Sequence, residues 1–321
     1  MRRSSFFRAA NASAAATPPS PLAKFLASHE IGAQLRTGYT HLYDHRTVAD
    51  ETHIPSAAEE LRLRCRRGNF AGQTSGLAPG FVQANLVALP KEHAFDFLSF
   101  AMRNPKACPL LAVTAPGDPC PGPIAPCADL RTDLPRYRIW EHGKLVDEVD
   151  DASDAWGDDF VGFLLGCSFS WEHLLAERGL TPRHVQSSGV EAKTVPMFHT
   201  SVPNQRAGPF GGELVVSMRP YAPANLIEVE TLTASYPGAH GGPVHWGNPA
   251  KLGISDLSSP EWGDSVQLRE GELPVFWACG VTPQTAIAEA ALPCLVVTHA
   301  PGRMFVCDIL DQDLQVPAVN N

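Results

Sequence analysis

The chain has 321 residues, of which 44% are hydrophobic and 18% charged, and a formal net charge of −9 at pH 7. That length can bury a large core without disulfides, and the negative charge argues against nucleic acid, whose phosphates attract basic surfaces. Because no apolar run approaches the ~20 residues of a membrane helix, we expect a soluble protein with neither a membrane nor a nucleic acid as its partner. The negative charge does not exclude an anionic small substrate, which needs only a local cluster of Arg side chains and helix N-termini.

The N-terminus differs in composition from the rest of the chain. Residues 1–29 contain Arg2, Arg3, Arg8 and Lys24 and no acidic residue, among many Ser and Ala residues. This composition is typical of an organellar presequence. We therefore expect an N-terminal extension over residues 1–52, in which the first ~24 residues are disordered and dispensable and direct the chain to mitochondria. If the extension is only a disordered tail, we expect the chain in the cytoplasm. The eight cysteines form no CxxC pair, which favours a reducing compartment.

Strands and helices alternate irregularly along the chain. Ser56 and Glu59 fit a capping box, which predicts a helix to about Arg67. Alternating polarity predicts a strand over 81–89 with Gln83 and Asn85 on one face. Further strands are predicted at 109–114, 137–141, 144–149, 160–165, 194–200, 213–219, 243–246, 275–279, 294–299 and 303–309, and helices at 90–102, 172–178, 223–235 and 283–291. This order predicts an α+β (mixed α/β) fold with mixed sheets.

The segment from Pro274 to Thr285 carries the clearest candidate site. An apolar strand ends at Cys279, and Gly280 permits a tight turn. Thr282 followed by proline predicts a helix with Thr282 as its N-cap. Free amides at a helix start attract anions, and Gln284 adds donors. A purely structural helix cap is the alternative.

Three histidines follow strand ends or glycine-rich turns. His299 ends an apolar strand before a Pro-Gly turn, which suits acid–base chemistry near neutral pH. His240 and His245 flank a Gly-Gly-Pro turn, and their spacing of five differs from the i, i+4 spacing of a zinc helix. We expect no metal. Because the sequence has no Walker loop and no GxGxxG motif, we also expect no nucleotide cofactor.

Two further positions could contact a carboxylate or act as a nucleophile. Arg219 follows an apolar strand and precedes Pro220, which we expect to stop that strand. Arginine suits two-pronged carboxylate recognition, although it could equally pair with a structural acid. Cys167 and Ser168 lie near a predicted helix start, where a thiolate is stabilised, but the segment lacks the Gly-x-Ser-x-Gly of a nucleophile elbow.

Eight segments of the sequence carry a resemblance. They lie in order over about residues 53–310 and are Gly80–Asn85, Asn104–Leu110, Asp129–Tyr137, Gly166–Ser170, Val216–Pro220, Ala239–His245, Val275–Gln284 and Thr298–Gly302. Together they resemble the hydro-lyase family that includes the mitochondrial D-glutamate cyclases. The resemblance implies two α+β lobes, the smaller inserted in the larger, in a catalytic domain 53–312 followed by a tail 313–321. It also implies a carbon–oxygen lyase whose small carboxylate substrate is an amino or hydroxy acid, with dehydration of D-glutamate to 5-oxo-D-proline as the characterised reaction.

That reaction joins an amine to a side-chain carboxylate and expels water, so it needs a base, an acid and oxyanion donors. We expect segments 275–285 and 298–302 to meet at one cleft, because ligands bind beyond strand ends. Two alternatives remain: a non-catalytic protein that binds a small carboxylate, and a racemase or amidohydrolase that uses Cys167 or Cys279. The chain could also form a homo-oligomer. The residues expected in catalysis are His299, Cys279 and His240, and those expected in substrate binding are Arg219, Thr282, Gln284, Ser168 and His245.

Overall fold

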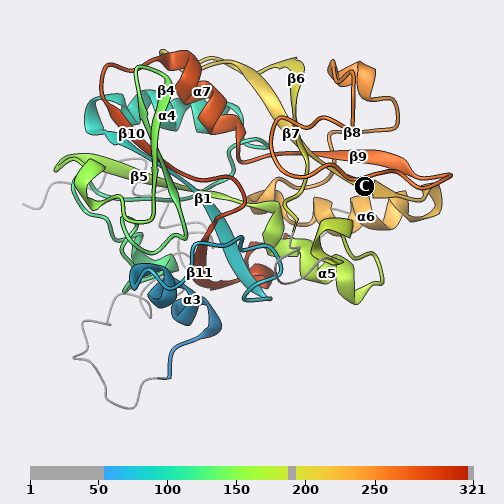
Figure 1. Cartoon of the computed structure of the whole chain (residues 1–321), viewed down its shortest axis with the longest axis horizontal. Helices are drawn as coiled ribbons and strands as arrows, with labels where there is room; N and C mark the ends of the chain where they lie inside the picture. The colour runs from blue at the N-terminus through green and yellow to red at the C-terminus, as the bar shows by residue number, and fades with distance from the viewer. Residues whose placement is uncertain (1–53, 187–192, 317–321) are drawn as a thin grey trace, which may run out of the picture. The chain divides into compact units, whose positions relative to one another are not determined.

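The computed structural model describes residues 54–186 and 193–316. The chain divides into two compact units, 1–50 and 51–321, and every described residue lies in the second. This unit contains two sheets with helices packed against them (Figure 1), which confirms the α+β class. Across the described ranges, no helix is long and apolar enough to cross a membrane. The expected presequence lies outside the described residues.

The larger sheet has the strand order β2-β5-β1-β10-β3-β4, and β11 also pairs with β1. β3 and β4 form the predicted hairpin, and its turn residues His142 and Gly143 both have positive φ, as a type I′ turn requires. The strands are β1 (Phe81–Pro90), β2 (Leu110–Val113), β3 (Tyr137–Glu141), β4 (Lys144–Val149), β5 (Phe160–Gly166), β10 (Leu295–His299) and β11 (Phe305–Leu310).

β1 has two different neighbours along one of its edges. Its first half pairs with β11, up to Ala84 opposite Phe305. Its second half pairs with β10, from Val87 opposite Thr298. On this edge, residues 85 and 86 therefore have no strand partner, while β5 pairs continuously along the other edge.

The smaller sheet, of order β6-β7-β9-β8, comes from one stretch of chain between β5 and β10. Every pairing in the two sheets is antiparallel, so the predicted mixed sheets are not found among the described strands.

The strand β7 does not end before Pro220 as the sequence predicts, because it continues to Tyr221. Pro220 lies opposite Pro274, so one position of the ladder carries both missing N–H groups. The strands are β6 (Met197–Pro203), β7 (Glu213–Tyr221), β8 (His245–Trp246) and β9 (Leu273–Ala278).

The helices begin close to their predicted positions. Ser56 caps the first helix, since its hydroxyl accepts the Glu59 N–H at 3.1 Å. Thr282, however, is the first residue of its helix rather than its N-cap. The Thr282 hydroxyl instead accepts the Val215 N–H of β7 at 3.1 Å. The helices are α3 (Ala57–Arg66), α4 (Lys91–Arg103), α5 (Glu172–Glu177), α6 (Leu226–Ala234) and α7 (Thr282–Ala290).

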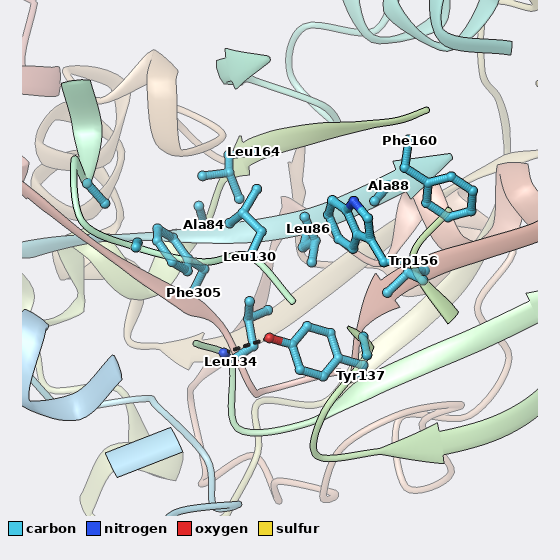
Figure 2. Close-up of a cluster of buried hydrophobic side chains, with 14 of the residues drawn as sticks. Ala84, Leu86, Ala88, Leu130, Leu134, Tyr137, Trp156, Phe160, Leu164 and Phe305 are labelled. Carbon is cyan, nitrogen blue, oxygen red and sulfur yellow. Dashed lines mark hydrogen bonds between the residues drawn. The ribbon is translucent and has the colours of Figure 1, made fainter. Parts of the chain in front are cut away.

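β1 has a hydrophobic core on each of its faces. Ala84, Leu86 and Ala88 point into one core together with Tyr137, whose hydroxyl accepts the Leu134 N–H at 3.0 Å (Figure 2). Alternate residues of β1 point to the opposite face, where α4 and α7 pack (Figure 1). Because strand side chains alternate between faces, Gln83 and Asn85 lie on this second side, in line with the predicted pattern.

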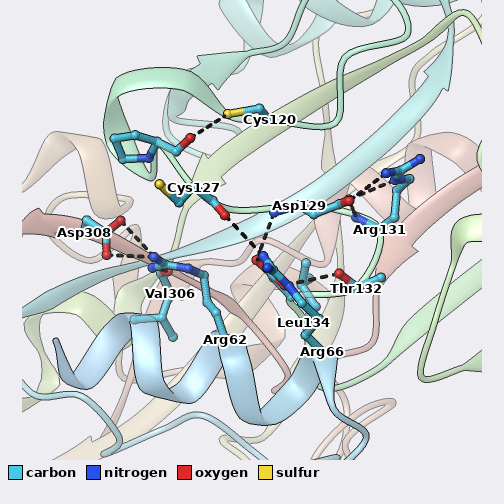
Figure 3. A network of polar contacts seen from close by, with 12 residues as sticks. Arg62, Arg66, Cys120, Cys127, Asp129, Arg131, Thr132, Leu134, Val306 and Asp308 are labelled. Carbon is cyan, nitrogen blue, oxygen red and sulfur yellow. Dashed lines mark hydrogen bonds and ion pairs between the residues drawn. The ribbon is translucent and has the colours of Figure 1, made fainter. Parts of the chain in front are cut away.

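A polar network attaches α3 to the rest of the unit (Figure 3). Arg62 donates to both carboxylate oxygens of Asp308 at 2.8 Å and to the Val306 carbonyl at 2.7 Å. Arg66 donates to Asp133, whose side chain is 1% exposed, with Nε 2.7 Å from Oδ1. These are charge-assisted bonds from a helix to a strand and a loop, so they stabilise the position of α3.

Replacing Asp133 with alanine should lower the free energy of unfolding by about 2–3 kcal/mol, because buried charge-assisted bonds are lost. Urea denaturation measures this. Asp129→Ala is the control, because the Asp129–Arg131 pair is more exposed and should contribute at most about 1 kcal/mol. Equal losses for the two variants would contradict the anchoring role of Asp133.

Candidate functional site

A small enclosed cavity lies where strand ends of both sheets meet. Its volume of about 20 Å³ gives room for roughly one water-sized group. Four of the predicted site residues line it: His240, His299, Cys279 and Ser168. The segments 275–285 and 298–302 therefore do meet, as the sequence predicts. The remaining lining residues are Asn85, Cys167, Phe169, Val195, Met197, Gly280, Val281, Gly302 and Met304.

Asn85 of β1 lines the cavity and holds together the end of β5 and the turn at Gly280. Its Nδ2 donates to the carbonyls of Leu165 at 3.1 Å and Gly166 at 2.8 Å, which fixes the end of β5. Gly280 lies against the same side chain, so closely that a Cβ on Gly280 would lie 2.1 Å from the Asn85 amide. Asn85 is not among the site residues predicted from the sequence. A polar residue within an otherwise apolar strand is the feature that could have indicated it.

His299 is held at the gap in the edge of β1. Its Nδ1 lies 3.2 Å from the Leu86 N–H, which has no strand partner on that edge. Gln284 Nε2 donates to the His299 carbonyl at 2.9 Å, so Gln284 positions His299 and does not itself line the cavity. Burial, together with the charge of Arg138, lowers the pKa of His299 to about 4, which leaves the imidazole neutral at pH 7.

His240 offers the cavity a hydrogen-bond acceptor. Its Nδ1 lies 2.8 Å from the Lys106 carbonyl. Because a carbonyl only accepts, Nδ1 carries the hydrogen, and the lone pair is on Nε2. Nε2 is buried and has no hydrogen-bond partner among the described residues. Burial lowers the pKa of His240 to about 4, and its φ of 74° is a strained conformation of the kind found at functional sites.

Two cysteine thiols line the cavity, each directly after a strand end. Burial raises the pKa of Cys279 to about 11 and raises that of Cys167 further, so both are protonated at pH 7. The backbone amides of Val281 and Gly280 act against burial and lower the pKa of Cys279, so these amides lie near its sulfur. Sulfur is a weak acceptor, so a ligand oxygen could compete for these two donors.

Arg219 lies behind the cavity wall. It is 1% exposed, and its Nε donates to Glu172 Oε1 at 3.1 Å while its Nη2 donates to Ser168 Oγ at 3.0 Å. The guanidinium also lies over the rings of Trp171, at 4.8 Å, and Trp277, at 5.4 Å. Its charge is thus compensated by Glu172. It bonds to the wall through Ser168, and its positive charge also acts on Cys279, Cys167 and His240.

Glu172 is the buried anion that holds this arrangement. His184 Nε2 lies 2.9 Å from Glu172 Oε1, on the same oxygen that Arg219 contacts. Burial by itself would raise the pKa of Glu172, but His184 and Arg219 outweigh it and lower the pKa to about 2. The sequence analysis missed both Glu172 and His184, because neither lies in a recognisable motif.

The other predicted residues are not on the cavity wall. Thr282 is bonded to β7, as described above. His245 stacks on Phe276 with ring centroids 6.1 Å apart, and its Nε2 lies 2.9 Å from the Asn248 carbonyl. A search of the described ranges finds no group of three His, Cys, Asp or Glu side chains that could hold a metal ion. The site can therefore supply neutral acids, bases and amide donors from its own residues.

Comparisons with known proteins agree on one family. The D-glutamate cyclase family model matches residues 161–308. A Rubrobacter xylanophilus protein named "Putative hydro-lyase" is 55% identical over 262 residues, covering 82% of this chain and 99% of that protein. Similarly named proteins of Bordetella petrii and Burkholderia multivorans are 50% and 51% identical, covering 83% and 82% of this chain and 99% of each relative.

Among solved structures, a nitrogen repressor-like protein from Methanococcus jannaschii aligns with a TM-score of 0.31 at 10% identity, covering 78% of this chain and 94% of that one. This likeness carries no argument about fold or function.

Replacing Gly280 with alanine should destabilise the protein by about 2 kcal/mol, because the new methyl group overlaps Asn85. Adding Asn85→Ala removes the overlap, so the double variant should lose less stability than the sum of the two single losses. Gly238→Ala is the control, since its Cβ would meet its nearest neighbour at an ordinary 3.4 Å. Strictly additive losses in urea denaturation would refute the contact.

Replacing Arg219 with alanine should destabilise the protein by about 3–5 kcal/mol, because Glu172 then stays buried without a main partner. Adding Glu172→Gln should recover part of that loss. If Arg219→Ala instead unfolds like the wild type but binds its substrate weakly, Arg219 contacts the substrate carboxylate directly, as the sequence suggested.

Proposed function

The chain belongs to the hydro-lyase family that includes D-glutamate cyclase, and it is therefore an enzyme of the hydro-lyase kind. We propose that it converts D-glutamate to 5-oxo-D-proline and water. The observation that carries this proposal is the cavity that unites His240 and His299 with Cys279. All three lie within the matched residues 161–308. The cyclisation needs an acid, a base and oxyanion donors, and this wall holds groups for each role.

In the proposed mechanism the neutral α-amine of the substrate attacks the carbon of its own protonated side-chain carboxyl group. His240 Nε2, which has no hydrogen-bond partner among the described residues, accepts one proton from the attacking nitrogen and passes it to the departing hydroxyl, which leaves as water. The amides of Gly280 and Val281 and the Cys279 thiol donate to the oxyanion. His299 completes the wall, and Arg219 acts as a positioning residue by holding Ser168.

A second candidate is a racemase that uses both cavity thiols. Cys167 and Cys279 follow strands of different sheets and line one cavity, so one thiolate could remove the Cα proton while the other thiol returns it. The raised pKa of both thiols opposes formation of the thiolate, so we rank this candidate second.

One assay separates the two functions. The protein is incubated with D-glutamate, and the products are resolved by chiral chromatography. The proposal expects 5-oxo-D-proline at a rate proportional to enzyme concentration. L-glutamate as the product would establish the racemase instead, and unchanged D-glutamate would refute both candidates for this substrate.

His240→Asn should lower kcat for the cyclisation by roughly 100-fold or more, because the proton-transfer group is lost. Asparagine tolerates the positive φ at this position, so the fold should persist. The matched control is His245→Asn, which changes a histidine of the same segment outside the cavity wall and should stay within about twofold of the wild type. A similar rate loss in both variants would contradict the assignment of His240.

We also propose that residues 1–29 direct the chain to mitochondria, because this segment is basic and free of acidic residues. A fluorescent fusion of the full chain expressed in yeast should co-localise with a mitochondrial marker. Changing Arg2, Arg3 and Arg8 to glutamate should abolish import. A cytosolic signal from the unaltered fusion would support the cytoplasmic alternative.

A further inference from the structure

The wall of the cavity carries no formal charge. None of the described residues that line it is Asp, Glu, Lys or Arg. Two of the cations behind the wall are compensated: Arg219 by Glu172, and Arg138 by Glu148 at 2.7 Å. The wall itself has no cation among its described residues, so a carboxylate that entered the cavity would lose its hydration without a charged partner on the wall, and such a transfer costs several kcal/mol.

The hydrogen-bonding groups of the wall also disfavour an anion. Two amide donors, from Gly280 and Val281, lie near the Cys279 sulfur and have no backbone acceptor among the described residues. His240 Nε2 is an acceptor that has no partner within the same ranges. A carboxylate has acceptors only, so it could satisfy the amides but would place a lone pair against that of His240. A protonated carboxyl group and a primary carboxamide each carry an acceptor and a donor, and therefore match both parts of the wall.

We propose that the cavity binds the reacting end of its substrate in an uncharged form, and that the enzyme therefore also cyclises D-glutamine, releasing ammonia. This inference rests on the proposed cyclisation at the same cavity. The α-amine nitrogen forms a bond to the side-chain carbonyl carbon, and the bond from that carbon to the amide nitrogen breaks. The proton lost by the amine leaves with the departing nitrogen as ammonia. No oxidant, reductant or second substrate is required.

The two substrates should differ in their pH dependence. The side chain of D-glutamate is a carboxylate above about pH 5, so its reactive neutral fraction falls tenfold per pH unit. The carboxamide of D-glutamine does not titrate in this range. The titratable groups of the wall hold one protonation state from pH 6 to 9, because the pKa is about 4 for His240 and His299 and about 11 or higher for Cys279 and Cys167. Behind the wall lie Glu172, Arg219, His184, Arg138 and Lys106.

The experiment measures kcat/KM for D-glutamine and D-glutamate with the full chain from pH 6 to 9, after subtraction of enzyme-free cyclisation. Ammonia release and chiral detection of 5-oxo-D-proline are the readouts. We expect D-glutamine to be the better substrate at pH 8 by at least tenfold. Both substrates must have their α-amine deprotonated, so the titration of the amine cancels in the ratio of the two kcat/KM values. That ratio should rise about tenfold per pH unit, because only the D-glutamate side chain also loses its reactive neutral form. His240→Asn should lose both activities. His199→Ala, in a histidine that stacks on Trp262 outside the cavity wall, should keep both.

The outcomes separate this inference from the proposed function. Turnover of D-glutamate and none of D-glutamine, or a ratio of the two kcat/KM values that does not change with pH, would overturn the inference and leave the cyclase proposal intact. Turnover of D-glutamine alone would support the inference and overturn D-glutamate as the substrate. Absence of both activities would overturn both.

Discussion

The amide side chain of Asn85 fixes the geometry on which the site depends. It bonds the last two carbonyls of β5 and packs against Gly280, at the turn that follows β9. One side chain thus brings the end of a strand from each sheet to the same point. A second close approach reinforces it, because a Cβ on Gly166 would lie 1.7 Å from the Gly238 carbonyl. The loop that carries His240 can reach β5 only because Gly166 has no side chain.

The gap in the edge of β1 explains why a histidine occupies this place. Where β10 ends and β11 has not yet begun, the Leu86 N–H lacks a strand partner. A buried N–H without an acceptor is costly, and His299 Nδ1 supplies one. The same bond that completes the sheet therefore fixes the orientation of a site residue. Structural and functional demands coincide at this histidine.

Charge is separated from the cavity by one layer of side chains. Glu172 forms a buried ion pair with Arg219 and also contacts His184. Ser168 links Arg219 to the wall, and His184 lies against the wall residue Phe169. The wall itself keeps neutral imidazoles and protonated thiols. Such an environment strengthens hydrogen bonds to a developing oxyanion, since the local dielectric is low. It also makes the protonation state of an entering substrate a condition for binding.

The sequence by itself determined the elements and their order. The N-cap at Ser56, the alternation in β1 and the His142-Gly143 turn are local signals that depend on nearby residues only, and the structure confirms each. Only the tertiary structure decided which polar residues meet. Arg219, Thr282 and His245 are residue types that often occur in active sites. In the structure, however, Arg219 pairs with Glu172 and Thr282 bonds to Val215. His245 lies outside the cavity wall. Asn85 joins strand ends that lie 80 residues or more away along the chain. Contacts at that separation depend on how the two sheets pack, which no local pattern encodes.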